Sequence, residues 1–178
     1  QQVMLEDAAG NEDKAIEMLN QWGGKPLPIS ACAWTGGDLA LRLSGAASAV
    51  AAARETIGGE LIESGQAQRF WAGIREQTDP FFRTDKPLWR LSVPSITLPL
   101  GLPGEQLIEW GGSLRWLASN ADARTVREAA AHAGGHATLF RAADKSAGVF
   151  TPLAPALAKI HRKLKRAFDP AGVFNPGR

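Results

Sequence analysis

Apolar and polar residues follow an order along the first third of the chain that predicts six elements. Four alternating stretches predict strands, and two stretches with apolar residues at helical spacing predict helices. The two central strands flank Gly36-Gly37, a pair that indicates a two-residue β-hairpin turn. In chain order the predicted elements are a strand over 3–6, a helix over 13–22, strands over 28–35 and 38–45, a helix over 46–57 and a strand over 60–63.

A second stretch repeats this order in topology more than in sequence. Its hairpin turns on Gly111-Gly112, and a proline-rich connection over 94–106 stands where the first unit has its first helix. The predicted elements are a helix over 66–76, a loop over 78–87, a strand over 88–94, a hairpin over 107–119, a helix over 125–133 and a strand over 136–140. Two such units predict an α+β fold, in which two ferredoxin-like units share one antiparallel sheet with helices on one face. We divide this single domain into residues 1–64, 65–150 and 151–178.

The second hairpin carries the candidate binding surface. Its turn pairs Ile108 with Arg115 and Leu107 with Trp116, so alternate residues share a face. One face holds Ile108, Trp110, Ser113 and Arg115, and the other holds Leu107, Glu109, Leu114 and Trp116. With neighbouring strands in register, Arg90, Ser92, His136 and Thr138 join the face of Trp110 and Arg115. Arginine binds carboxylates or phosphates and tryptophan offers a flat apolar wall, so this face suits a ligand; cover by another domain is an equally weighted alternative.

The C-terminal part of the chain combines an amphipathic helix with a tightly turned tail. The helix is expected over 152–168, with an apolar stripe on one side and basic residues on the others. The tail reads "FDPAGVFNPGR", in which Asp169–Gly172 suits a type I turn and Asn175–Gly177 a type II turn. Val173 and Phe174 between these turns are suited to plug an apolar groove.

Composition excludes several classes of protein. The 178 residues carry 20 Lys and Arg against 18 Asp and Glu, which argues against a dedicated nucleic-acid binder. No apolar run approaches the length of a membrane span. Cys32 is the single cysteine, so an internal disulfide is impossible and a reducing, cytoplasmic compartment is expected. The chain begins at Gln1 rather than at Met, and we expect it to be a fragment of a longer protein.

Motifs for metal or nucleophilic chemistry are missing from the sequence. His132 and His136 have i, i+4 spacing, but Gly134-Gly135 should end the helix between them and no cysteine or third histidine is near in sequence. No nucleophile elbow and no phosphate-cradling glycine loop is visible. The sequence therefore predicts no metal site.

Several strings resemble a known family. The ending "FDPAGVFNPGR" resembles the C-terminal signature of FAD-linked oxidases of the vanillyl-alcohol oxidase type. More narrowly, the chain from Pro26 to Arg178 is similar to the FAD-binding subunit of glycolate oxidase. The strings that carry this narrower resemblance are "PLPIS", "FWAGIREQTDPFF", "LWRLSVPS", "LPGEQLIEWGGSLRWL" and "AGGHATLFRA".

The resemblance implies a C-terminal cap domain of a flavoprotein oxidoreductase subunit, whose N-terminal FAD domain is not part of this sequence. It implies FAD as cofactor in the longer subunit, oxidation of glycolate to glyoxylate by the complex, and a homologous flavin subunit and an iron–sulfur subunit as partners. The fragment itself is expected to be inactive. The residues expected to approach the FAD are Arg90, Trp110, Arg115, His136, Asn175 and Arg178.

Two questions stay open at this point. The family's metal-binding histidine cluster is missing, which leaves open whether this subunit oxidises glycolate itself or passes electrons. Association with the inner face of the membrane through partner subunits is also left open. A stand-alone ferredoxin-like module that binds a small molecule or another protein is the alternative, and a glycine-rich flavin loop upstream of Gln1 would argue against it.

Overall fold

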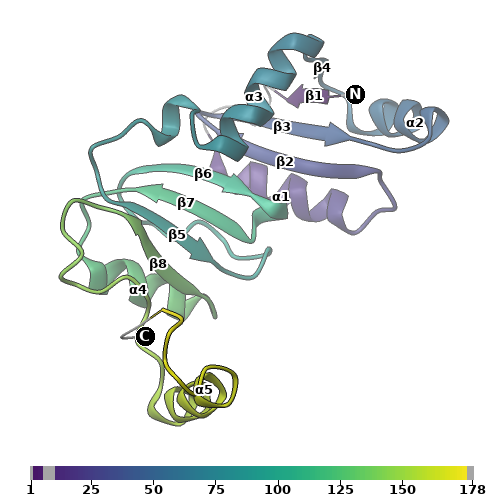
Figure 1. The fold of residues 1–178 in the computed structure, drawn as a ribbon. Coiled ribbons are helices and arrows are strands. Elements are labelled where there is room, and N and C mark those ends of the chain that lie inside the picture. Colours follow the sequence, from purple (N-terminus) through teal and green to yellow (C-terminus); the bar gives the residue numbers. More distant parts are fainter. Residues whose placement is uncertain (1, 6–10, 176–178) are drawn as a thin grey trace.

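One antiparallel sheet organises the structure, a computed structural model that describes residues 2–5 and 11–175. Within these residues eight strands pair in the order β4-β1-β3-β2-β6-β7-β5-β8 (Figure 1). The strands are β1 (Gln2–Leu5), β2 (Ile29–Thr35), β3 (Asp38–Leu43), β4 (Glu60–Leu61), β5 (Leu88–Ser92), β6 (Glu105–Glu109), β7 (Leu114–Ala118) and β8 (His136–Arg141). The helices are α1 (Glu12–Gly23), α2 (Ala47–Ile57), α3 (Ser64–Glu76), α4 (Ala123–His132) and α5 (Pro155–Phe168), with short 3-10 turns η2 (Pro80–Phe82) and η3 (Trp110–Gly112). The α+β class and the antiparallel sheet predicted from the sequence are confirmed.

The sheet consists of two halves with matching strand order. Each half places its fourth strand outermost, then its first, third and second, and the two second strands β2 and β6 meet at the centre. There Ala33 pairs with Glu109 and Trp34 with Ile108. The second half has no described helix between β5 and β6, so it matches the first half in strand order and not in its full set of elements.

Helices cover both faces of the sheet, whereas the sequence predicted helices on one face. Helices α1, α2 and α4 pack on one side, which we call the α1 face; its core includes Leu39, Leu41 and Leu91. Helix α3 and the turn η2 pack on the other side, the α3 face, against Leu107 and Trp116. The prediction failed for α3 because its apolar residues show that it packs on a sheet but not on which side.

Helix ends are fixed by side-chain caps and by close backbone contacts. The Asn11 side chain accepts a hydrogen bond from the Lys14 N–H at the start of α1, and Asp122 does the same for Arg124 and Thr125 in α4. After α4 the chain passes Gly135 so close to β5 that a Cβ there would collide with the carbonyl oxygen of Ser92. The "AGGHAT" string is thus explained physically, since only glycine permits this approach.

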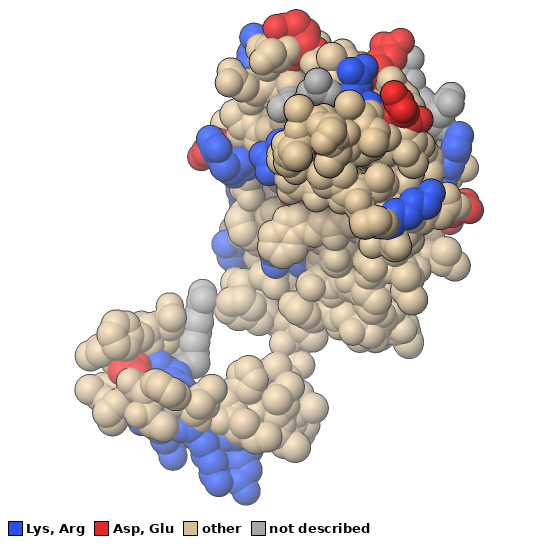
Figure 2. Space-filling model, turned by 90° about the vertical axis from the view of Figure 1, so that its right-hand side faces the viewer, with Lys and Arg blue, Asp and Glu red and all other residues tan. Residues whose placement is uncertain are grey.

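Helix α5 extends away from the sheet (Figure 1). It starts close to the predicted position and has the predicted apolar stripe, but none of its residues is buried. The stripe of Leu157, Ile160, Leu164 and Phe168 is 44–80% exposed. Lysine and arginine side chains gather along the outer edge of α5 (Figure 2). A basic amphipathic helix with an uncovered apolar side therefore projects from the domain.

Candidate functional site

A hollow on the α3 face is lined by charged and aromatic side chains. Its volume is about 770 Å³, and it lies between helix α3 and strands β2, β3, β5, β6 and β7. Its charged and aromatic lining residues are Arg42, Trp71, Arg75, Arg90, Glu109, Trp110 and Trp116. We call this set the Arg-Trp groove. Arg75 forms an ion pair with Glu76, which leaves the guanidinium groups of Arg42 and Arg90 against the carboxylate of Glu109. The groove is therefore a cationic site with flat apolar walls.

Two of the three arginines are held against indole rings. The Arg90 guanidinium carbon lies 5.6 Å from the ring centre of Trp110 and 6.0 Å from that of Trp116. The Arg42 guanidinium carbon lies 5.7 Å from the ring centre of Trp71, and its Nε donates a hydrogen bond to Ser30 at 3.0 Å. Stacking orients both guanidinium planes and leaves donor groups for an anionic ligand.

The carboxylate of Glu109 lies in the groove beside Arg90. The indole N–H of Trp116 donates a hydrogen bond of 2.8 Å to it. Burial raises the pKa of Glu109, and this effect exceeds the opposing effects of the Trp116 hydrogen bond and the Arg90 charge. Glu109 therefore keeps its proton to a higher pH than an exposed glutamate does.

Trp110 reaches this groove because the hairpin turn is not the simple two-residue turn that the sequence predicts. The register of the β6–β7 hairpin is confirmed, with Ile108 opposite Arg115 and Leu107 opposite Trp116. At Trp110, however, the backbone enters the left-handed region at φ 52° and begins the 3-10 turn η3. This rotation takes the Trp110 side chain out of strand alternation and onto the α3 face, where it stays 67% exposed.

Arg115 lies on the opposite face, so the predicted grouping with Arg90 and Trp110 is wrong. Arg90 pairs with Trp116 across β5 and β7, and Leu91 is the residue opposite Arg115. Arg115 is fully buried on the α1 face. It donates hydrogen bonds to Gly112 O at 2.8 Å, to Thr97 O at 2.5 Å and to Glu12 Oε1 at 3.2 Å. These contacts make Arg115 a structural residue that joins η3, the 94–104 loop and α1.

The remaining predicted site residues are dispersed. His136 pairs with Ser92 on the outermost strand β8 and shares the α3 face with Arg90, but it is exposed and does not line the groove. Asn175 lies in the tail, and Arg178 lies outside the described residues. The structure therefore brings together Arg90 and Trp110 and places Arg115, His136 and Asn175 apart from them.

Sequence reasoning did not assign Arg42, Trp71 or Glu109 to the site. The alternation of the first hairpin placed Arg42 on the side of Ala31 and Ala33, and the β2–β6 pairing brings that side onto the face of Glu109. Strand alternation was thus a usable signal for Arg42 and Glu109. Trp71 gave no such signal, because it enters the groove from helix α3.

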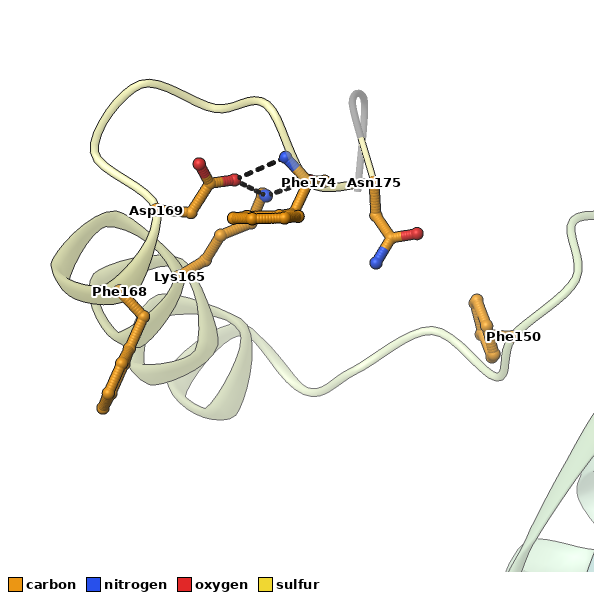
Figure 3. A pocket seen from close by; sticks show the side chains of 6 residues that line it. All are labelled: Phe150, Lys165, Phe168, Asp169, Phe174 and Asn175. Atoms are coloured by element: carbon orange, nitrogen blue, oxygen red, sulfur yellow. Dashed lines mark hydrogen bonds and ion pairs between the residues drawn. The ribbon is translucent and has the colours of Figure 1, made fainter.

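The tail forms a second hollow of about 540 Å³ around the end of α5 (Figure 3). The Asp169 carboxylate accepts hydrogen bonds from Lys165 Nζ at 2.8 Å and from the N–H groups of Val173 and Phe174 at 3.0 Å. The hydrogen bond from Lys165, followed by those from the backbone, holds the pKa of Asp169 below its usual range. Gly172 N–H donates to Asp169 O, as the predicted turn requires. The tail is thus folded on itself while Phe168 and Phe174 stay exposed.

Two further findings concern the described part of the chain. No group of three or more His, Cys, Asp or Glu side chains there is arranged to hold a metal ion. No helix there has both the length and the apolar character needed to cross a bilayer.

Comparison with known proteins finds a curated relative of this chain. The chain is 47% identical over 165 residues to glycolate oxidase subunit GlcE of Escherichia coli (strain K12), an alignment that covers 93% of this chain. The chain is thus similar in sequence to this subunit. The resemblance recognised from the sequence strings is confirmed, and it supports the C-terminal region of a GlcE-like FAD-linked oxidase subunit. The chain spans 45% of the length of that relative, a little under half. No family model matches the chain, and no solved structure matches it.

Proposed function

We propose that this chain is the C-terminal cap region of the flavin-binding subunit of a glycolate oxidase complex. We also propose that its Arg-Trp groove faces the isoalloxazine ring of an FAD held by the N-terminal part of that subunit. The main support is the combination of 47% identity to GlcE with a coverage of 45% of its length. On this view the domain that holds the FAD pyrophosphate lies in the other part of the longer subunit.

The groove suits the edge of a flavin. FAD, when bound, supplies the hydride-transfer chemistry, and the protein supplies position and charge. Arg90, stacked on Trp110 and Trp116, offers guanidinium donors to an electron-rich ring edge or to a carboxylate. Glu109, with its pKa raised by burial, adds a carboxyl group beside Arg90 that takes up a proton more readily than usual. No phosphate-cradling element belongs to the groove, in keeping with a cap rather than a nucleotide-binding role.

We further propose that α5 and the tail pack against the same N-terminal flavin domain. The stripe of α5 and Val173 and Phe174 of the tail leave several large apolar side chains exposed near the end of the chain. The hydrogen bonds of Asp169 hold this end in one shape, so docking needs little further ordering. On this proposal, residues 1–178 alone should not oxidise glycolate, because the FAD is held by another part of the subunit.

The test uses the full-length subunit with its partners. Arg90→Met removes the stacked guanidinium of the groove. Arg127→Met is the matched control, since the Arg127 guanidinium also lies over an indole ring, that of Trp89 at 5.6 Å, but on the α1 face. We expect Arg90→Met to lower glycolate-dependent dye reduction or FAD content at least tenfold, while Arg127→Met preserves both. If Arg90→Met leaves both quantities at the parent level, the groove does not face the flavin.

A further inference from the structure

The loop over 94–104 presents two apolar side chains to solvent beside helix α1. Ile96 is 74% exposed and Leu98 is 71% exposed, which are among the highest exposures of large apolar residues in the described chain. Together with α1 they line a hollow of about 460 Å³ whose floor includes the buried Ile16. Exposed apolar side chains at a groove indicate an interaction surface more often than isolated ones do.

The backbone that carries these side chains is fixed from below. The Asn20 side chain of α1 donates a hydrogen bond to Ser95 O at 3.0 Å. Arg115 Nη2 donates to Thr97 O at 2.5 Å. At Gly112 a Cβ would come within 2.6 Å of Ser95 O, so η3 packs tightly on the same segment. Ile96 is thus held between two anchored residues and Leu98 follows the second, and a partner binding there loses little conformational entropy in the loop.

The charges at this hollow are of one sign. Among the residues that line it, Asp13 and Glu17 are the charged ones, and both are acidic. Glu12, at the start of the same helix, is already engaged by Arg115 and by Gln106 Nε2. Lysine and arginine are thus lacking from the lining. Asp13 and Glu17, the latter accepting a hydrogen bond from Gln21 Nε2, form an acidic rim beside the apolar pair. A complementary partner carries apolar side chains flanked by lysine or arginine.

We propose that the surface formed by Ile96, Leu98, Asp13 and Glu17 docks an apolar segment with basic flanks from another subunit of the oxidase complex. The proposal rests on the proposed function only in assuming that the chain works within a complex. The surface lies on the α1 side of the sheet, away from the Arg-Trp groove, so its contribution to assembly is separable from flavin chemistry. Arg115, which the sequence placed at the flavin, then acts here as a positioning residue for the docking loop.

The experiment compares assembly and flavin content in the full-length subunit co-expressed with its partner subunits. The test variant is Ile96→Asp/Leu98→Asp, and Leu61→Asp is the matched control because Leu61 is also exposed, at 50%, but lies on β4 at the far edge of the sheet. We expect the test variant to weaken co-purification of a partner at least about tenfold, as loss of a binding hot spot does, while the FAD content of the subunit stays at the parent level. Asp13→Lys/Glu17→Lys, which changes only exposed charges, should also weaken it and remove its salt dependence.

Several outcomes would overturn the proposal. One is parent-level co-purification of the partner with the test variant. Another is equal loss with Leu61→Asp. Light scattering on the subunit alone gives a third: a dimer that the test variant converts to monomers would identify a second copy, rather than a partner subunit, as the occupant. Loss of FAD without loss of assembly would instead count against the placement of the flavin, so the two proposals fail in different ways.

Discussion

The buried Arg115–Glu12 pair yields the sharpest stability prediction. Arg115→Met removes a guanidinium that is fully buried and makes three hydrogen bonds, and it leaves the carbonyl oxygens of Gly112 and Thr97 without this donor. Each buried acceptor left unpaired costs about 1–3 kcal/mol. Breaking a buried ion pair by removing one partner costs about 3–5 kcal/mol in total. Since a domain of this size is stable by about 5–15 kcal/mol, the variant should fold but with a large loss.

The pH dependence of this loss identifies its cause. Burial raises the pKa of Glu12 above its ordinary value of 4.5, and the Arg115 charge partly offsets this rise. Without Arg115 the folded-state pKa of Glu12 rises further. A carboxyl group with a raised folded-state pKa binds more protons in the folded state, so its folded form loses stability as pH rises above the unfolded-state value. The difference between Arg115→Met and the parent should therefore be larger at pH 7 than near pH 4.

Urea titrations at both pH values, followed by circular dichroism and tryptophan fluorescence, measure this difference. Glu12→Gln in the Arg115→Met background should recover about 0.5–3 kcal/mol at pH 7, since it removes the unpaired charge. The control Arg124→Met changes an exposed arginine and should stay within about 0.5 kcal/mol of the parent. A loss below about 1 kcal/mol, or one that is the same at both pH values, would refute the assignment of Arg115 to a buried ionic network.

Three further predictions concern other parts of the chain. Glu109→Gln should stabilise the fold at pH 7, because burial raises the pKa of Glu109 and the folded state disfavours its charge. The gain should vanish below about pH 4, where Glu109 is protonated in both the folded and the unfolded state, and urea titrations in which the gain does not shrink with falling pH would contradict this. Gly135→Ala should lower the free energy of unfolding by about 3 kcal/mol or more, since the new Cβ would collide with the β5 backbone. In the same titrations the control Gly23→Ala, at the end of α1 where nothing lies within 4 Å, should be neutral or mildly stabilising. Leu164→Ser should change the stability of this 178-residue chain by less than about 0.5 kcal/mol, because Leu164 is 56% exposed. If the flavin domain covers α5, the same substitution should destabilise the full-length subunit by about 1.5–3 kcal/mol, and equal thermal shifts in both proteins would argue against that docking.

Sequence reasoning captured what depends on local periodicity and failed where tertiary placement decides. The hairpin register around Gly111-Gly112 and the apolar stripe of α5 follow from alternation and helical spacing, and both are present. The side of the sheet on which α3 packs does not follow from periodicity, because an amphipathic helix packs equally well on either face. The register of β5 against β7 does not follow from periodicity either. A shift of one residue decides whether Arg90 or Leu91 shares the face of Arg115.

Trp110 shows how a single backbone angle redefines a binding site. Strict alternation places Trp110 on the α1 face with Arg115, but its positive φ begins a 3-10 turn and moves the indole to the α3 face. A non-glycine residue in this region is strained, and such strain persists where the surrounding structure compensates for it. Two contacts stabilise the turn here. The Arg90 guanidinium stacks on the Trp110 ring, and the N–H of the next residue, Gly111, donates a hydrogen bond to the buried Cys32 sulfur. Replacing Trp110 by glycine would relieve the backbone and remove the wall of the groove at once. A gain in stability together with a loss of flavin-dependent activity in the full-length subunit would show that the strained turn serves the site rather than the fold.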